Sequence, residues 1–357
     1  MPTQAGPVPP QTALRTPAPQ TLARARALAE PALRAAVATL HPLPARMAAF
    51  SFGWCEADGT PSPSPGGKGV RQAFALLGAE AVGTPLGTAV QAAVAVELVH
   101  TFSLVHDDIM DGDERRRHRD ATWKAFGTGP AVLTGDALFA LAVRTVAEAG
   151  GEHAGRAVAH LADCLGELVR GQADDLLFEN RPWTGQGAVG IPEYEAMAAR
   201  KTGALLGCAL SLGPVLAGAP PLQTGALAEA GRRLGTAFQI VDDLLGIWGD
   251  PRTTGKPVHG DLLRRKKTLP VLAAVALDDG ATARELARLL GPDTPPDAAA
   301  ADHAAGLIEA SGGREFALEE AHRHATAAHD CLRGSGLAEG AAGELVALSA
   351  HLLERQL

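Results

Sequence analysis

Two groups of aspartates, far apart in the chain, have the residue types and spacing that could hold a divalent metal ion. Asp107, Asp108 and Asp111 close the most apolar segment of the sequence, and Asp107 and Asp111 are four residues apart, on one face of a helix. Acids at the C-terminus of a helix oppose its dipole and repel one another, so a cation should lie beside them. Mg²⁺ prefers a few carboxylates and completes its octahedron with waters and phosphate oxygens. We therefore predict a Mg²⁺ site here.

The second group lies in another apolar segment, where Asp242 and Asp243 follow Gln239. Either group alone could be a charged helix surface that faces water. Buried acids without partners are costly, however, and an apolar helix is a poor place for such a surface. Two carboxylate clusters on two core helices predict a polar mouth above an apolar cavity.

Basic residues lie close to these acids in the sequence. Lys68 and Arg71 are one helical turn apart behind a glycine-rich segment, whose free N–H groups also favour an anion. Five of the six lysines lie in short polar segments of this kind, together with three consecutive arginines: Lys68, Lys201, Lys256, Lys266, Lys267, Arg115, Arg116 and Arg117. Lysine and arginine suit phosphate oxygens, so with two Mg²⁺ sites these residues could neutralise two diphosphate groups.

Helices must position these groups. Aromatic residues make up only 4% of the 357 residues, and the sequence is rich in Ala, Leu, Glu and Arg, which favours helices over sheets. Prolines forbid a helix in the first residues, so we predict a disordered tail at 1–20 and a single all-helical domain at 21–357. We expect a loop at 56–67 and helices over roughly 21–41, 67–77, 88–109, 134–149, 154–178, 192–217, 222–248, 269–277, 281–290, 300–311, 314–332 and 336–355.

Charge and composition exclude several classes of protein. The net charge of −8 disfavours binding to nucleic acid or to an anionic membrane surface. We find no apolar run near the ~20 residues that span a bilayer and no secretion signal, so we expect no stable membrane insertion and a cytoplasmic location. The four cysteines have no CxxC spacing, and we expect them to be reduced and structural.

The motifs together resemble those of the trans-isoprenyl diphosphate synthases, the polyprenyl synthetase family, over roughly residues 45 to 350. The resemblance implies an all-α barrel of antiparallel helices around an apolar central cavity, usually assembled as a homodimer. It also implies a Mg²⁺-dependent condensation of isopentenyl diphosphate with an allylic diphosphate, with three ions in each active site.

Roles for individual residues follow from the resemblance by position. The first Asp-rich motif, which binds Mg²⁺ and the allylic diphosphate, is matched by Asp107, Asp108 and Asp111, with Arg116 serving the same group. The isopentenyl diphosphate site is matched by Lys68, Arg71, His100 and Arg117. The remaining diphosphate and metal contacts are matched by Lys201, Thr202, Gln239, Asp242, Asp243, Lys256 and Lys267.

Within these sets, we expect the metal ligands to be Asp107, Asp111 and Asp242, and the catalytic group to comprise Asp107, Asp108, Asp111, Lys201, Asp242 and Lys256. Gln172 and Asp175 match a further family motif, and Asp175 would support the metal cluster.

Product length in the family depends on the residues just before the first Asp-rich motif. Phe102 stands five residues before Asp107, Ser103 follows it, and Val99 lies one turn back. A bulky aromatic at this position, without an insertion in the motif, resembles geranylgeranyl diphosphate synthases. We therefore expect a C20 product, with farnesyl diphosphate as the main competing product, although Phe102 could also be an ordinary core aromatic.

The sequence departs from the family pattern at two places. Gly246 stands where many members have a third aspartate in the second motif, so the metal there would be held chiefly by Asp242, with Asp250 a distant candidate. His118 and Asp120 stand where Gly and Pro are common. A class I terpene cyclase and a non-catalytic regulatory subunit are the alternatives, but the first needs no second diphosphate site and the second usually tolerates loss of the aspartates.

Overall fold

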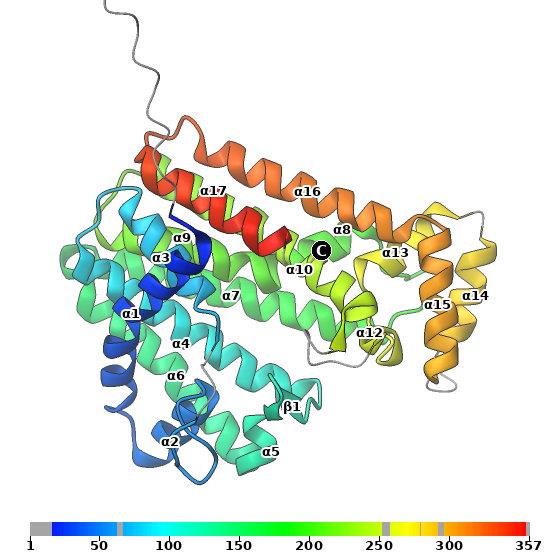
Figure 1. Ribbon diagram of the computed structural model, residues 1–357, viewed down its shortest axis with the longest axis horizontal. Helices are drawn as coiled ribbons and strands as arrows, with labels where there is room; N and C mark the ends of the chain where they lie inside the picture. Colours follow the sequence, from blue (N-terminus) through cyan, green and yellow to red (C-terminus); the bar gives the residue numbers. More distant parts are fainter. Residues whose placement is uncertain (1–15, 63–66, 252–257, 279, 292–295, 355–357) are drawn as a thin grey trace, which may run out of the picture.

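The computed structural model describes residues 16–62, 67–251, 258–278, 280–291 and 296–354, and nearly all regular structure in these ranges is helical (Figure 1). The prediction of an all-α fold is therefore confirmed. The first half contains α1 (Ala18–Val37), α2 (Pro42–Ser51), α3 (Val70–Glu80), α4 (Leu86–Met110), α5 (Thr122–Phe126), α6 (Thr128–Ala149), η1 (Gly151–His153) and α7 (Ala154–Glu179). The second half contains α8 (Ile191–Ala198), η2 (Ala199–Gly203), α9 (Ala204–Leu216), α10 (Pro221–Trp248), α12 (Gly260–Leu263), α13 (Leu269–Leu277), α14 (Ala281–Leu289), α15 (Ala298–Ala310), α16 (Gly313–Leu332) and α17 (Glu339–Glu354).

Helix α9 lies at the centre of the fold. Every one of its residues is buried, and it packs against α3, α4, α7 and α10. Because an apolar helix has no polar face for water, other helices must cover it on all sides. Figure 1 shows α16 and α17 running alongside each other over one side of this core, with α14 and α15 at one end of the molecule.

Several predicted boundaries need correction. Helix α1 begins at Ala18, directly after Pro17, so residues 18–20 are helical and not part of a disordered tail; residues 1–15 lie outside the described ranges. Helix α1 ends at Val37, and Pro42 and Pro44 lie in the first turn of a second helix, α2, where proline is tolerated. The short helices α2, α5 and α12 were not predicted, and neither was a hairpin of β1 (Arg115–Arg116) and β2 (Arg119–Asp120).

The helix predicted over 192–217 is interrupted at η2, which is a turn of π-helix. It lies where three helical segments come unusually close, because glycines leave no side chain between them. A Cβ on Gly171 of α7 would overlap the backbone nitrogen of Lys201, and a Cβ on Gly235 of α10 would overlap Gly203. The π turn and these glycines together bring Lys201 and Thr202 against α7 and α10.

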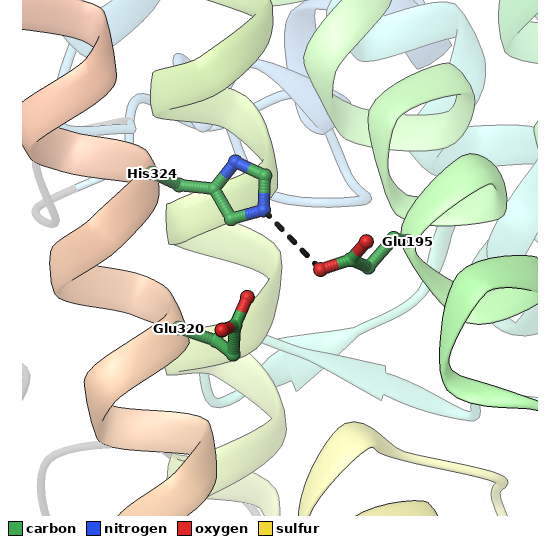
Figure 2. Close-up of side chains that lie close together, drawn as sticks. All are labelled: Glu195, Glu320 and His324. Carbon is green, nitrogen blue, oxygen red and sulfur yellow. Dashed lines mark ion pairs between the residues drawn. The ribbon is translucent and has the colours of Figure 1, made fainter.

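A polar cluster connects α8, the helix that precedes η2, to α16. Figure 2 shows Glu195 of α8 facing Glu320 and His324 of α16, with 3.7 Å between His324 Nε2 and Glu195 Oε1. Arg323 donates hydrogen bonds to both carboxylates, and its Nη2 lies 3.2 Å from His324 Nε2. Burial lowers the pKa of His324 to about 4, so its neutral ring can accept that bond. The cluster thus carries its own cation, and we assign it a structural role.

Two helices, α4 and α6, are long and apolar enough to cross a membrane by length and composition, so our expectation that no segment qualifies is wrong. Of the most apolar window in each, 61% is buried inside the fold in α4 and 44% in α6. Core helices pass the same test, and the absence of stable membrane insertion stays a prediction.

The close approach at η2 can be tested with two alanine substitutions in α7. Gly171→Ala should lower the free energy of unfolding by about 1–3 kcal/mol, because the new methyl group forces α7 away from η2. Gly166→Ala is the matched control, since nothing lies within 4 Å of its Cβ position. The control should gain about 0.5–1 kcal/mol from the better helix propensity of alanine. Denaturant unfolding measures both, and equal effects would contradict the packing account.

Candidate functional site

The first Asp-rich motif lies at the C-terminal end of α4 and faces two lysines from other elements. Lys201 Nζ of η2 lies 2.6 Å from Asp175 Oδ2 of α7. Lys266 follows α12 in the sequence, and its Nζ lies 3.2 Å from Asp111 Oδ1 and 3.8 Å from Asp175 Oδ2. Chain segments separated by more than 150 residues therefore meet in one cluster of acids and lysines.

Burial raises the pKa of Asp107 to about 6, although Lys201 opposes the rise. For Lys266, burial alone would lower the pKa, but Asp175 and Asp111 raise it above the ordinary value. Both pKa values are raised, which disfavours the charge on Asp107 and favours the charge on Lys266, so the lysines only partly balance the acids. Further positive charge at Asp107 would be favourable, and the donor set of carboxylate oxygens from Asp107 and Asp111 on one helix face fits a hard divalent cation.

Asp108 has a different environment from its two neighbours. Its side chain is buried, and its Oδ1 accepts a hydrogen bond of 2.7 Å from Arg116 Nε and lies 2.6 Å from Nη2. Arg116 is in the β1–β2 hairpin, whose turn residues Arg117 and His118 have φ of 51° and 66°. This left-handed backbone is strained for side chains other than glycine, which accounts for the glycine that the family often has at the position of His118.

The two acids of the second Asp-rich motif, on α10, differ in their exposure to solvent. Asp242 is exposed, whereas Asp243 is buried. Oδ2 of Asp243 accepts hydrogen bonds from the Tyr194 hydroxyl at 2.6 Å and from the Leu269 N–H at 3.0 Å. Gln239 Nε2 donates to Oδ1 of Asp243 at 3.0 Å, and burial raises the pKa of Asp243 to about 7. Asp243 is thus held inside the fold by hydrogen bonds, whereas the Asp242 side chain is exposed at the surface of α10.

Thr202 joins this network from η2. Its hydroxyl donates a 2.6 Å hydrogen bond to Gln239 Oε1, so Thr202, Gln239 and Asp243 form one chain of hydrogen bonds. The structure therefore brings together two residues, Thr202 and Gln239, that the sequence placed in the same diphosphate contact set.

The packing around position 246 explains why glycine, and not an aspartate, stands there. A Cβ added there would overlap the carboxyl group of Asp261 in α12. The space that a side chain at 246 would enter is therefore taken by the carboxylate of Asp261. An acid from α12 thus lies beside α10 where the second motif lacks its third aspartate.

A basic cavity of about 390 Å³ lies beside the turns of α4 that precede the first Asp-rich motif, where Glu97, His100, Thr101 and Leu104 line it. His100, Arg117 and the turn at Gly67–Gly69 contribute to its wall, and Arg71 Nη1 lies 3.1 Å from His100 Nε2. Burial lowers the pKa of Arg71 to about 10 and holds the pKa of His100 well below its ordinary value. Lys68 is exposed on the turn that borders the cavity.

Sequence reasoning missed Glu97, which lines this cavity. It lies one helical turn before His100, and burial raises its pKa while Arg71 and Arg117 oppose the rise. An acid in the middle of a long apolar helix was itself the signal, because such a group needs cations nearby. Glu97 partly balances the arginines and keeps them in the cavity wall.

Three other predicted residues have different outcomes. Lys267 lies away from the acid cluster, with its Nζ 4.1 Å from the centre of the Trp183 ring, and burial lowers its pKa to about 8. Lys266 takes the place we had expected for Lys267. Lys256 lies outside the described residues. Gln172 is buried on α7 with neither side-chain amide atom hydrogen-bonded to the described part of the protein.

The residues expected to limit product length lie on the face of α4 that meets α6. Phe102 packs with its ring centre 5.7 Å from that of Phe139 and 5.1 Å from that of His106. Val99 is fully buried, and Ser103 donates a 2.9 Å hydrogen bond to the carbonyl of His100. Phe102 does not line the 390 Å³ cavity.

Comparisons with known proteins agree with this geometry. The family model for polyprenyl synthetase matches residues 54–308. The chain is 42% identical to a (2E,6E)-farnesyl diphosphate synthase of Mycobacterium tuberculosis, over 94% of this chain and 92% of that protein. It is 43% identical to a geranylgeranyl diphosphate synthase of the same organism, over 83% of each.

A crystal structure of a polyprenyl synthetase from Streptomyces coelicolor superposes with a TM-score of 0.85 at 45% identity, covering 93% of this chain and 98% of that one. The match in sequence, in fold and over nearly the whole length leads to one conclusion: the chain is a member of the polyprenyl synthetase family.

Proposed function

We propose that the protein condenses isopentenyl diphosphate with an allylic diphosphate and releases diphosphate, in a reaction that requires Mg²⁺. The observation that carries this proposal is the pair of different anion environments on α4. The C-terminal end of α4 presents acids beside lysines, which suit a diphosphate bound through metal ions, and the preceding turns lie beside arginines and carry a histidine, which suit a diphosphate bound directly.

Asp107 and Asp111 would hold Mg²⁺ at the end of α4, and Asp242 would hold it from α10. Three ions in each site would match the number expected from the family. The bound ions would supply positive charge that stabilises the leaving diphosphate. Asp261 lies close enough to Gly246 to add a carboxylate on the Asp242 side.

The protein side chains orient the two substrates and complete the charge balance. Lys201 and Lys266 would contact the diphosphate that leaves the allylic substrate, as its carbon–oxygen bond breaks. Arg71, His100 and Arg117 would hold isopentenyl diphosphate so that its double bond attacks the allylic cation. A proton is then lost, with the released diphosphate as its acceptor, and the helical walls exclude water that would capture the cation.

We propose geranylgeranyl diphosphate as the product, because Phe102 lies on α4 before the first motif. The similarity to a farnesyl diphosphate synthase over nearly the whole chain favours the C15 product as the second candidate. Incubation of the purified protein with Mg²⁺, isopentenyl diphosphate and allylic diphosphates of increasing length, followed by chromatography of the dephosphorylated products, tests both. Cyclic hydrocarbons would indicate a terpene cyclase, and no product would indicate a regulatory subunit.

We also propose a cytoplasmic homodimer. Large apolar side chains on α6 and α7 are exposed in the single chain, including Leu133 at 60%, Val169 at 57% and Leu177 at 65%. A second copy of the chain would cover them, since contiguous exposed apolar surface commonly marks an interface.

The metal role of the first motif gives a direct prediction. Asp107→Ala should lower turnover by a factor of about 10³ at saturating substrate, because the leaving diphosphate loses charge stabilisation. Steady-state kinetics with and without excess Mg²⁺ measures the effect. Asp330→Ala, at an exposed acid on α16, is the control and should leave turnover unchanged. Full activity of Asp107→Ala, or of wild type in excess chelator, would refute the metal-site proposal.

The position of Asp261 predicts that the missing aspartate cannot simply be restored. Gly246→Asp should lower both stability and activity, because its Cβ would collide with the Asp261 carboxyl and two acids would repel each other. Gly246→Asp combined with Asp261→Gly should recover both by at least half. Thermal unfolding and turnover of the two variants provide the test, and a fully active, stable Gly246→Asp single variant would count against this account.

Phe102→Ala tests the basis of the proposed product length. Removing the ring should open space toward Val99 and shift the products beyond twenty carbons, and the loss of this partly buried side chain should also lower the free energy of unfolding. Chromatography of the products from the folded variant measures the shift. If the folded variant is active and its product distribution is the same as that of wild type, the chain-length determinant lies elsewhere.

A further inference from the structure

The basic cavity has a wall that neither the motifs nor the family match includes. Helix α1 precedes the matched residues 54–308, yet Arg26, Glu30, Leu33 and Arg34 of this helix line the cavity together with His100. Among them, Arg26 is the residue that contacts the glycine-rich turn. This turn carries Lys68, so α1 reaches the proposed isopentenyl diphosphate site from outside the residues that the family model matches.

Arg26 is held in a defined position against the turn. Its Nη2 donates a 2.5 Å hydrogen bond to the carbonyl oxygen of Gly67, and its Nε would lie 3.9 Å from a Cβ on Gly69. Arg117 approaches Gly67 as well, since a Cβ there would lie 2.7 Å from Arg117 Nη1. Gly67 therefore lies against two guanidinium groups, and any side chain at this position would displace Arg117.

The charges around the cavity are unequal. Arg26, Arg71 and Arg117 all act on Glu97, each lowering the pKa that burial raises. Arg71 Nε is buried without a hydrogen-bond partner in the described part of the chain. Three arginines around one carboxylate leave an excess of positive charge, which an anion in the cavity would balance.

We propose that Arg26 is a positioning residue for isopentenyl diphosphate. It fixes the Gly67–Gly69 turn through the Gly67 carbonyl, so that Lys68 and the N–H groups of the turn face the diphosphate, and it adds positive charge to the cavity wall. This inference rests on the proposed function and extends the site to an element that no motif included.

Helix α1 makes two further contacts through arginines other than Arg26. Arg24 pairs with Glu80 of α3 at 2.8 Å, and Arg34 lies over the Trp54 ring at 4.2 Å from its centre. The first of these contacts is exposed on the outside of the helix and away from the cavity. Arg24 therefore provides a control for loss of an arginine from α1 that does not alter the cavity.

The test compares Arg26→Ala, Arg26→Lys and Arg24→Ala with wild type. Loss of a charged hydrogen bond should raise the KM for isopentenyl diphosphate in Arg26→Ala by about tenfold, with kcat and the KM for the allylic substrate changed less than about twofold. Arg26→Lys should recover part of the loss because it keeps the charge. Arg24→Ala should match wild type in all three parameters.

Calorimetric titration with isopentenyl diphosphate alone provides the second measurement, and Arg26→Ala should bind it about tenfold more weakly than wild type. An unchanged affinity in folded Arg26→Ala overturns the role of Arg26 while leaving the proposed function intact. An equal rise in both KM values, or an equal effect of Arg24→Ala, overturns it as well, since either points to a general loss of structure. Wild-type protein that neither binds isopentenyl diphosphate nor forms product overturns the proposed function and this inference together.

Discussion

Charge balance in a largely apolar helical interior is the constraint on which this site depends. Like charges that are buried together repel strongly and shift one another's pKa, so each group needs partners of opposite charge. At the C-terminal end of α4 the acids of α4 and α7 are held together by Lys201 and Lys266. Beside the preceding turns of α4 the arginines are held together by Glu97. The two regions are left with charge imbalances of opposite sign, and this difference allows two diphosphates to bind in different ways.

Backbone packing makes these partnerships possible. Lys201 reaches Asp175, and Thr202 reaches Gln239, only because η2 lies directly against α7 and α10. Glycines at 171 and 235 permit that approach, and the π turn sets the direction of the two side chains. π-helical turns within α-helices are frequent at functional sites, and here the turn coincides with the residues that would contact the leaving group. Stability and the proposed chemistry therefore depend on the same close contacts.

Much of this could be predicted from the sequence, because the helical periodicity and the Asp spacing are local signals. The all-α fold, the positions of most long helices and the presence of acids on two core helices follow from such signals. The choice between Lys266 and Lys267 could not be made in this way, since it depends on how the chain leaves α12. The interior role of Asp243 depends on Tyr194, which is 49 residues away in sequence.

The central claim is that the two diphosphates bind by different means, one through metal ions and the other through arginines. Calorimetric titration of wild-type protein with isopentenyl diphosphate, and separately with an unreactive thio analogue of an allylic diphosphate, tests it directly when each is measured with Mg²⁺ and with excess chelator. The account predicts that isopentenyl diphosphate binds with similar affinity in both conditions. The allylic analogue should lose affinity by about 100-fold or more in chelator. Equal dependence of both ligands on Mg²⁺, or undiminished binding of the allylic analogue in chelator, would contradict the account.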